Sequence, residues 1–253
     1  MEDQIILIDK PENITSFGVV ARVRRVLSEK FGHKIKVGQT GTLDPFATGL
    51  LILMSGKNTK KCQEFLKKDK SYEAILKLGE TSSTGDPEGE ITKVVNFTNY
   101  PNPKPIATDF TNYPNPKSGT VNPPTLSEVQ AVLKSFTGEI TQTVPRFSAV
   151  KINGHRAYDL ARKGEAPEMP TRKVTIYNIN LLSYDFPYLK ISCKVSSGTY
   201  IRSLAEDIGK ALQTGAYLTA LRRTSIDNYN VQDATPLEKW LQENSCQETK
   251  PVI

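Results

Sequence analysis

The order of the apolar patterns along the chain is the feature that most constrains its fold. Strands are predicted at residues 5–8, 71–79 and 188–195, where apolar residues form a run or alternate with polar ones. Helical spacing predicts helices at residues 16–31, 125–138, 156–163, after Gly198, and around 237–241. Because the predicted strands are not regularly separated by helices, a doubly wound α/β fold is not expected. The order predicts an α+β fold around a mixed or antiparallel sheet.

Two of the predicted helices have recognisable starting signals. Ser16 is expected to cap the first helix, whose apolar face includes Phe17 and Val20. Thr125 and Glu128 have the spacing of a capping box, in which each residue satisfies a backbone N–H of the other.

The composition excludes several classes of protein. The chain has 253 residues, of which 38% are hydrophobic and 24% charged, as in ordinary globular proteins. No apolar run approaches the roughly 20 residues that span a bilayer, and the N-terminus has no pattern of a signal peptide. Three cysteines and two histidines are widely scattered, which fits a reducing compartment and predicts no metal site. We therefore expect a cytoplasmic, metal-free protein.

The charge of the chain favours an anionic partner. Thirty-three Lys and Arg residues against 27 Asp and Glu residues give a net charge of +6. Basic residues cluster at 22–25, 57–61, 67–70 and 222–223. Each cluster taken singly is typical of a solvated surface, whereas several clusters around one site would attract a polyanion.

The segment 37–51 (VGQTGTLDPFATGLL) has the densest pattern of residues that could present a reactive group. Its glycines permit tight turns, and Pro45 restricts the backbone of Asp44 to extended conformations. The pattern also fits a simple Asp-Pro turn in which the carboxylate bonds to its own backbone. A rigid carboxylate without a second acid nearby indicates instead a nucleophile or an ion-pair partner.

Arg202 and Tyr72 are the other candidates for a reactive site. Arg202 lies off the apolar stripe of its predicted helix, and it either pairs with Glu206 as an exposed residue or holds Asp44 ionised. Tyr72 lies on the predicted strand 71–79. It is either an ordinary core aromatic or a ring that stacks on a flat ligand with its hydroxyl at the reacting end.

Six segments together resemble the TruB family of tRNA pseudouridine synthases. They occur in the family's order over residues 5–226 and read IDKP, GQTGTLDPFATGLL, KSYEAILKLGETSSTGDPEG, PRFSAVKINGHRAYDLARKGE, SSGTYIRSLAEDIG and AYLTALRRTSI. The resemblance implies a pseudouridine-synthase fold, with a mixed, mostly antiparallel sheet flanked by helices and an RNA-binding cleft. It also implies that a monomer isomerises uridine 55 in the T-loop of tRNA to pseudouridine without a cofactor.

The resemblance also implies roles for individual residues. Asp44 matches the catalytic aspartate, Tyr72 the tyrosine that stacks on the target base and is proposed as the base, and Arg202 the arginine that pairs with the aspartate. The positions that match residues in or beside the substrate pocket are Tyr200, Leu221, Gln39, Lys10 and Lys151.

Two departures from the family's pattern change what we expect. Gln39 stands where most members have a histidine that enters the RNA loop as the base flips, so slower or altered flipping is expected. Only 27 residues follow Ile226, too few for the PUA domain that usually ends the family's chains. We therefore expect a catalytic domain over residues 1–229 and a tail with a short helix over 230–253.

One internal repeat is also present. FTNYPNPK occurs at 97–104 and again at 110–117, and its Pro and Asn residues exclude a regular helix or strand. The repeat is either a duplicated surface loop or an arm that helps grip a large ligand.

Two other functions remain open on the sequence. A non-catalytic RNA-binding or tRNA-folding protein could use the same scaffold, but it would not need an isolated carboxylate beside RNA phosphates. A nucleoside hydrolase would require a second carboxylate or a metal. We expect tRNA as the partner, with no membrane and no protein partner required.

Overall fold

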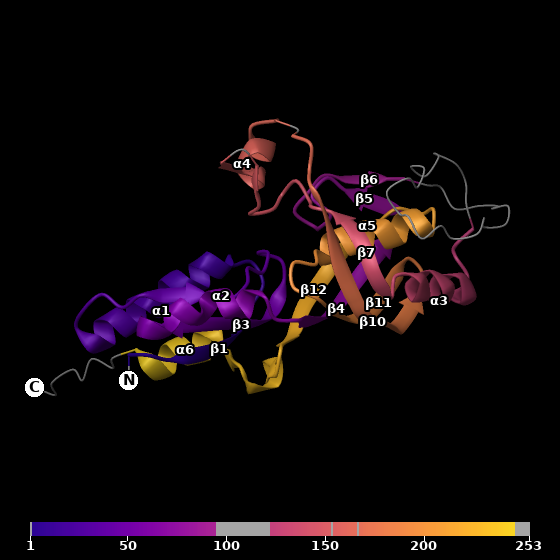
Figure 1. Ribbon diagram of the computed structural model, residues 1–253. Coiled ribbons are helices and arrows are strands. Elements are labelled where there is room, and N and C mark those ends of the chain that lie inside the picture. The colour runs from indigo at the N-terminus through magenta and orange to yellow at the C-terminus, as the bar shows by residue number, and fades with distance from the viewer. Residues whose placement is uncertain (1, 95–121, 153, 166, 246–253) are drawn as a thin grey trace, which may run out of the picture. The chain divides into compact units, whose positions relative to one another are not determined.

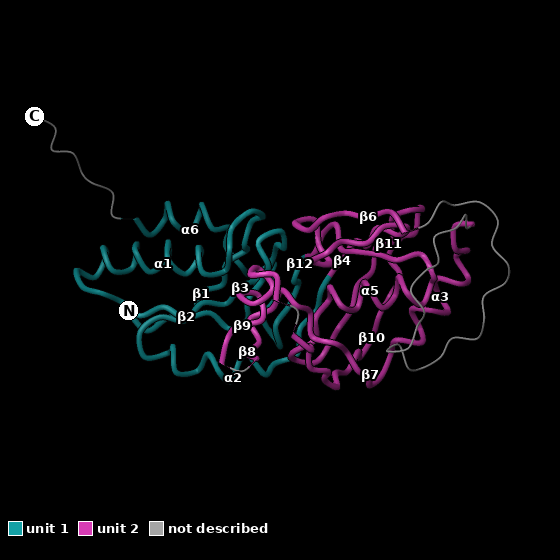
Figure 2. Tube along the Cα trace, turned by 90° about the horizontal axis from the view of Figure 1, so that it is seen from above, with its two compact units in different colours: residues 1–72, 222–253 teal, residues 73–221 magenta. Residues whose placement is uncertain are grey.

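The computed structural model describes residues 2–94, 122–152, 154–165 and 167–245 (Figure 1). The chain forms two compact units, unit 1 with residues 1–72 and 222–253 and unit 2 with residues 73–221 (Figure 2). Strands β4 (Lys70–Leu78) and β12 (Ala216–Ile226) run through both units. The repeat at 97–117 lies outside the described residues.

Unit 1 is built on a sheet with both parallel and antiparallel neighbours. Its strand order is β14 (Thr235–Pro236), β1 (Ile5–Lys10), β3 (Thr48–Ser55) and β12, with β2 (Val37–Gln39) on β3 and β13 (Tyr229–Asn230) on β12. β1 and β2 run antiparallel to β3, whereas β12 runs parallel to it. The helical segments are α1 (Ser16–Phe31), η1 (Gly56–Lys61), α2 (Cys62–Leu66), η3 (Val231–Asp233) and α6 (Leu237–Asn244).

The core of unit 1 contains side chains of α1, α6, β1 and β3. Val23 of α1, Ile8 of β1 and Leu51 of β3 are fully buried in it. Leu237 and Trp240 of α6 pack in the same core. The helix expected near the C-terminus is therefore present, and it contributes to the core of unit 1.

Two details of α1 differ from the prediction. Its cap is Thr15, whose side chain accepts the Gly18 N–H, while Ser16 is the first helical residue and is buried. Phe17 is 68% exposed, so its predicted place on the apolar face is wrong. At 3.6 residues per turn, Phe17 lies about 120° around the helix from Val23, the middle of the buried stripe.

Unit 2 has a second set of strands and two small hairpins. Its strand order is β12, β4, β11 (Tyr188–Val195), β10 (Thr171–Asp185) and β7 (Gly138–Thr143). The hairpins are β5 (Glu80–Ser82) with β6 (Ile91–Lys93), and β8 (Lys151–Ile152) with β9 (His155–Arg156). The helices are α3 (Leu126–Ser135), α4 (Ala157–Arg162) and α5 (Ile201–Ala211).

Several local predictions for unit 2 are confirmed. Buried and partly exposed residues alternate along β4, and Leu189 and Ile191 of β11 are fully buried. Thr125 and Glu128 form the capping box of α3. Leu204 and its neighbours bury the apolar face of α5 as its spacing predicts.

The predicted α+β class with a mixed, mostly antiparallel sheet is confirmed. The pairs β1–β14 and β3–β12 are parallel, while β1–β3, β2–β3, β7–β10, β10–β11 and β12–β13 are antiparallel. Of the helices that the structure describes, none has the length and apolar character to cross a membrane.

Candidate active site

Asp44 lies on the half-buried loop between β2 and β3, and the backbone on both sides of it is anchored. The Ser16 hydroxyl accepts the Leu43 N–H at 2.8 Å and donates to the Leu43 carbonyl at 2.9 Å. On the other side, the Pro45 carbonyl accepts the Asn13 N–H at 2.9 Å. Ser16 thus holds this loop instead of capping α1. The rigidity predicted from Pro45 is reinforced by contacts distant in the sequence.

Lys10 is part of the same support. Its side chain is fully buried, and its Nζ donates to the carbonyls of Pro11, Ile14 and Pro45 at 2.8, 2.8 and 3.1 Å. A buried ammonium requires several acceptors to offset the loss of water. Lys10 therefore anchors the Asp44 loop from the protein interior, through the carbonyl of Pro45, the residue that follows Asp44.

Gln39 bonds to its own loop. Its side-chain Nε2 donates to the Thr42 hydroxyl at 2.9 Å, and its Oε1 accepts the Gly41 N–H. These two bonds close the turn that leads to Asp44. If the Gln39 side chain entered an RNA loop, it would first have to break these two hydrogen bonds.

Tyr72 is buried on β4 beside an arginine that the sequence interpretation missed. Arg223 is 1% exposed, and its Nε and Nη2 donate to the carbonyls of Leu50 and Gly41 at 2.8 and 2.9 Å. Burial lowers the pKa of Arg223, and the nearby Tyr72 and the charge of Asp44 act in the opposite direction. Asp44 and Tyr72 therefore lie in the neighbourhood of Arg223 within unit 1.

The prediction that Arg222 and Arg223 form a solvated surface is wrong for Arg223. Successive residues of a strand point to opposite faces. Arg222 is partly exposed and forms a bidentate ion pair with Asp9, at 3.0 and 2.7 Å, whereas Arg223 points into the unit. The position of a paired Arg-Arg sequence on a strand was the signal that could have identified it.

A second buried cation lies close to Arg223. Lys70 is 8% exposed, and its Nζ donates to the carbonyls of Leu66 and Lys68 at 3.2 and 2.6 Å. Burial, and then the charge of Arg223, lower the pKa of Lys70 to about 8. Lys70 was expected on a solvated surface, and this prediction is also wrong.

Arg202 is buried in unit 2, at the start of α5. It donates to the carbonyls of Thr84 and Phe147 at 2.9 and 2.8 Å and forms an ion pair with Asp86 at 3.3 Å. Its side chain is 5% exposed, so the alternative of an exposed arginine paired with Glu206 is wrong. The expected pairing of Arg202 with Asp44 joins residues of the two units and stays a prediction.

The other predicted site residues of unit 2 occupy different environments. Tyr200 caps α5 with its backbone bonded in both directions to Gln142, and the Arg172 guanidinium lies 4.9 Å from the centre of its ring. Leu221 is 7% exposed on β12. Lys151 is exposed on β8.

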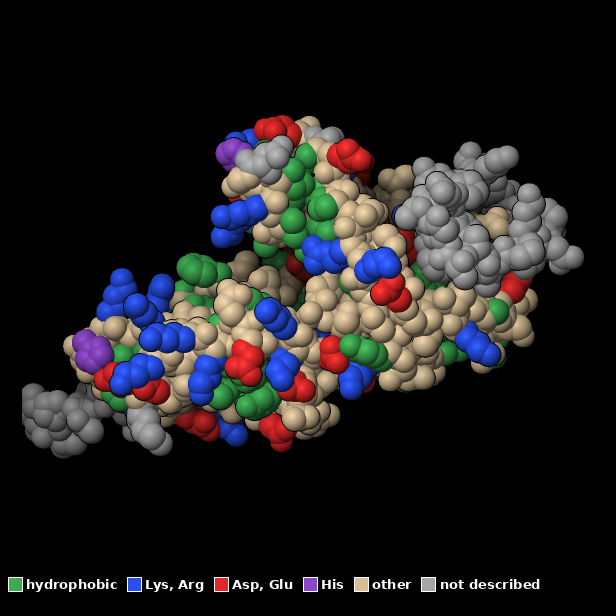
Figure 3. All heavy atoms as spheres, viewed as in Figure 1, with side chains coloured by type: hydrophobic (Ala, Val, Ile, Leu, Met, Phe, Trp, Pro, Cys, Tyr) green, Lys and Arg blue, Asp and Glu red, His purple; other side chains and the backbone are tan. Residues whose placement is uncertain are grey.

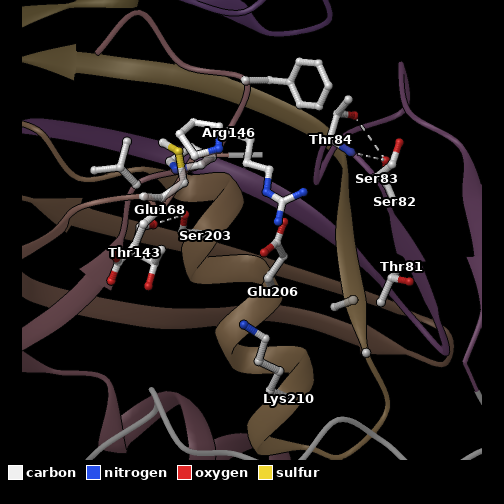
Figure 4. Close-up of a pocket in the computed structure, with 17 residues that line it drawn as sticks. Thr81, Ser82, Ser83, Thr84, Thr143, Arg146, Glu168, Ser203, Glu206 and Lys210 are labelled. Atoms are coloured by element: carbon white, nitrogen blue, oxygen red, sulfur yellow. Dashed lines mark hydrogen bonds between the residues drawn. The ribbon is translucent and has the colours of Figure 1, made fainter. Parts of the chain in front are cut away.

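Unit 2 also contains a cavity of about 700 Å³ that the sequence interpretation did not find. Figure 4 shows Ser203, Glu206 and Lys210 projecting into it from α5, with Thr84 and Thr143 on other parts of its wall. Burial raises the pKa of Glu206 to about 7, and the charge of Lys210 reduces this effect. Glu206 is thus a carboxyl group that changes charge near neutral pH.

Models of known families match most of the chain. The model of the TruB family pseudouridylate synthase N-terminal domain matches residues 24–115 and 106–201, and that of the tRNA pseudouridylate synthase B C-terminal domain matches residues 202–250. This chain belongs to the TruB family.

Relatives with similar sequences are named tRNA pseudouridine synthase B. The tRNA pseudouridine synthase B of Phocaeicola vulgatus is 41% identical over 251 residues, covering 98% of this chain and 97% of the relative. The enzyme of the same name from Aquifex aeolicus is also 41% identical, over 97% of this chain and 76% of the relative.

Solved structures confirm the TruB-family fold. The chain matches one in a Cbf5-Nop10-Gar1 complex with a TM-score of 0.65 and 25% identity, over 95% of this chain and 54% of that one. It therefore spans about half the length of that solved chain. The expected pseudouridine-synthase fold is confirmed.

Proposed function

We infer that this chain is a tRNA pseudouridine synthase, which isomerises a uridine of tRNA to pseudouridine. The observation that carries this inference is about 41% identity, over nearly the whole chain, to relatives named tRNA pseudouridine synthase B. We propose the T-loop uridine, position 55, as the target. The firmly held Asp44 loop supports the same conclusion, because the reaction requires a carboxylate at a defined position.

We propose Asp44, Tyr72 and Arg202 as the catalytic residues. The reaction breaks the glycosidic bond, rotates the uracil and joins it again through carbon 5. Asp44 attacks the anomeric carbon or assists a glycal intermediate, and Tyr72 stacks on the base and accepts the proton from carbon 5. Arg202 keeps Asp44 ionised and oriented. The isomerisation involves no net redox change, so the proposal includes no cofactor.

The remaining site residues are proposed to hold the flipped nucleotide. Tyr200 and Leu221 would line the pocket, Gln39 would support the opened RNA loop, and Lys151 would contact the RNA. Lys10 would act from behind the loop, through the Pro45 carbonyl that it bonds. Extruding a base costs about a few kcal/mol, which contacts to RNA phosphates offset.

The distribution of basic residues supports RNA as the substrate. Residues 16–70 contain twelve Lys and Arg against four Asp and Glu, an excess of 8 that exceeds the net charge of the whole chain, +6. Figure 3 shows Lys and Arg side chains spread over the visible face of unit 1. Such an excess predicts that tRNA binding weakens strongly as salt rises. We propose a cytoplasmic enzyme that acts as a monomer.

The test compares the wild type with Asp44→Asn on an unmodified tRNA transcript. The control variant is Asp233→Asn, which makes the same change at an exposed residue of η3. We expect Asp44→Asn to lower the rate of pseudouridine formation by at least about 1,000-fold while tRNA binding is retained. Equal rates in the wild type and Asp44→Asn would remove the role of Asp44. Binding without any product in the wild type would favour an RNA-binding protein.

A further inference from the structure

Gln142 and Arg172 lie opposite each other on neighbouring strands of unit 2, and both contact the segment that leads into α5. They are register partners in the antiparallel pair β7–β10, so their side chains project from the same face of the sheet. Gln142 contacts Tyr200, the N-cap residue of α5, and Arg172 contacts both Tyr200 and Gly198. The two side chains hold this segment in different ways.

Gln142 fixes the backbone of Tyr200. Its Nε2 donates to the Tyr200 carbonyl and its Oε1 accepts the Tyr200 N–H, both at 3.0 Å. Because Gln142 is fully buried, the oxygen and nitrogen ends of its amide both require partners, and Tyr200 supplies them. These two bonds fix the peptide groups on either side of the Tyr200 Cα, but they leave its side chain free to rotate.

Arg172 restrains the side chain that Gln142 leaves free. Its guanidinium carbon lies 4.9 Å from the centre of the Tyr200 ring, within the range of a cation–π contact. Its Nη1 also donates to the Gly198 carbonyl at 3.1 Å. Among the residues that the structure describes, Arg172 forms no ion pair with a carboxylate. The guanidinium is therefore held by the ring of Tyr200 and the turn before it.

The turn at residues 196–199 is shaped to admit the guanidinium. Gly198 has a φ of +82°, a conformation that favours glycine. A Cβ at Gly198 would lie 3.0 Å from Arg172 Nη1, so a side chain at this position would push the guanidinium away. The Thr199 hydroxyl donates to the Ser196 carbonyl at 2.9 Å. The carbonyl that anchors Arg172 thus belongs to a turn with a bond of its own.

An arginine can make both of these contacts at once. Its planar guanidinium can cover an aromatic ring with one face while an N–H on its edge bonds to a carbonyl, whereas a lysine ammonium has no flat face. Because the edge of the Arg172 guanidinium is bonded to Gly198, its face has a defined position at the start of α5. The Tyr200 ring that packs against this face is positioned with it.

We propose that Arg172 is a positioning residue for the isomerisation, which holds the Tyr200 ring in the orientation that the flipped uridine requires. This inference rests on the proposed function, which gives the Tyr200 ring a place in the substrate pocket. Arg172 acts through Tyr200. An arginine that bound an RNA phosphate would instead change the affinity for tRNA, and one that only stabilised the fold would change the melting temperature alone.

The test introduces Arg172→Gln into three backgrounds, the wild type, Tyr200→Phe and Tyr200→Leu. The matched control is Lys173→Gln, which removes the same charge from the next residue of β10, an exposed lysine paired with Glu139. Single-turnover rates with enzyme in excess, tRNA dissociation constants and melting temperatures are measured for each variant.

We expect Arg172→Gln to slow the reaction by about 10- to 100-fold in the wild type, with the tRNA dissociation constant of Lys173→Gln. The same factor is expected in Tyr200→Phe, because phenylalanine keeps the ring. In Tyr200→Leu the change should cost less than about threefold, because the ring that Arg172 holds is gone.

The opposite results would overturn the proposal. Equal factors in the wild type and Tyr200→Leu would do so, as would a factor lost already in Tyr200→Phe or an Arg172→Gln variant as fast as Lys173→Gln. Weaker tRNA binding at an unchanged rate would make Arg172 a phosphate contact instead.

Two further measurements cover variants that are inactive or unfolded. If Tyr200→Leu forms no measurable product, NMR of carbon-13-labelled tyrosine decides, with the Tyr200 ring signal identified by its loss in Tyr200→Phe. A displaced signal in Arg172→Gln supports the proposal, and an unchanged signal contradicts it. If Arg172→Gln does not fold, Arg172→Lys replaces it, and unfolding of both assigns Arg172 to stability alone. Absence of pseudouridine in the wild type would instead refute the proposed function.

Discussion

Replacing Glu206 by glutamine should stabilise the fold at neutral pH and leave its stability nearly unchanged at pH 4.5. Burial in unit 2 raises the pKa of the Glu206 carboxyl from 4.5 to about 7. Below pH 4.5 the carboxyl is protonated in the folded and the unfolded chain, and glutamine closely matches the protonated acid. Between pH 4.5 and 7 the unfolded chain loses this proton while the folded chain retains it, so the stability of the wild type falls.

The magnitude follows from the displacement of the pKa. The pKa of Glu206 rises by about 2.5 on folding, from 4.5 to about 7. At about 1.36 kcal/mol per pKa unit, the wild type therefore loses about 3 kcal/mol of unfolding free energy as the pH rises through this range. Glutamine has no such titration. The difference in unfolding free energy, Glu206→Gln minus wild type, should therefore rise by about 3 kcal/mol between pH 4.5 and 7.5.

The assay is urea denaturation at pH 4.5, 5.5, 6.5 and 7.5, followed by circular dichroism. The fluorescence of Trp240, in the core of unit 1, serves as a second probe of whether unfolding is a single transition. Glu139→Gln is the control, because Glu139 is an exposed residue of β7 paired with Lys173. If the difference in unfolding free energy between Glu206→Gln and the wild type does not change with pH, the reasoning is refuted. A Glu206→Gln variant less stable than the wild type at pH 7.5 would also refute it.

Three further predictions concern unit 1. Burial lowers the pKa of Lys70 in the folded chain to about 8, so the unfolded chain binds the proton more tightly. The unfolding free energy of the wild type should therefore rise by about 3 kcal/mol relative to that of Lys70→Met as the pH increases from 7 to 10.5. If urea denaturation shows the same change of unfolding free energy with pH for both proteins, the idea is wrong. Gly49→Ala should destabilise the fold by about 3 kcal/mol or more, since its Cβ would meet the Arg223 backbone at 2.3 Å. Gly32→Ala, with φ +74° and nothing within 4 Å, should lose only about 1–2 kcal/mol, and equal melting temperatures for the two variants would contradict the steric argument. Gln39→His should raise the single-turnover rate on tRNA without changing the tRNA dissociation constant. Histidine cannot make both hydrogen bonds by which Gln39 is held in its own loop, so the side chain is freer to enter the RNA loop. A slower reaction would contradict a role of position 39 in base flipping.

Local sequence patterns predicted several helices and strands correctly because they depend on short-range chemistry, but they did not predict the long strands β3, β10 and β12. The capping box at Thr125 and Glu128 and the burial along β4 follow from spacing alone. The first turn of α1 was harder, since Thr15 and Ser16 are both good capping residues. Thr15 caps the helix, while Ser16 bonds to Leu43, 27 residues further along the chain.

The candidate site was only partly predictable, because some of its contacts join residues that are far apart in the sequence. Asp44, Tyr72 and Arg202 were identified from motifs, and the structure shows Asp44 on an anchored loop and Tyr72 buried. Arg223 was missed because a pair of arginines looks like an ordinary basic surface. Its partners Gly41 and Leu50 are more than 170 residues away in the chain.

The amino-acid sequence by itself was enough to predict the α+β class and the family of this protein. It also identified the carboxylate, phenol and guanidinium groups that are available for chemistry. Only the tertiary structure decided which cations became internal. Lys10 and Arg223 are buried where backbone carbonyls from other segments accept their N–H groups. A charged side chain can leave water only where such acceptors converge, and that convergence exists only once the strands and loops have assembled.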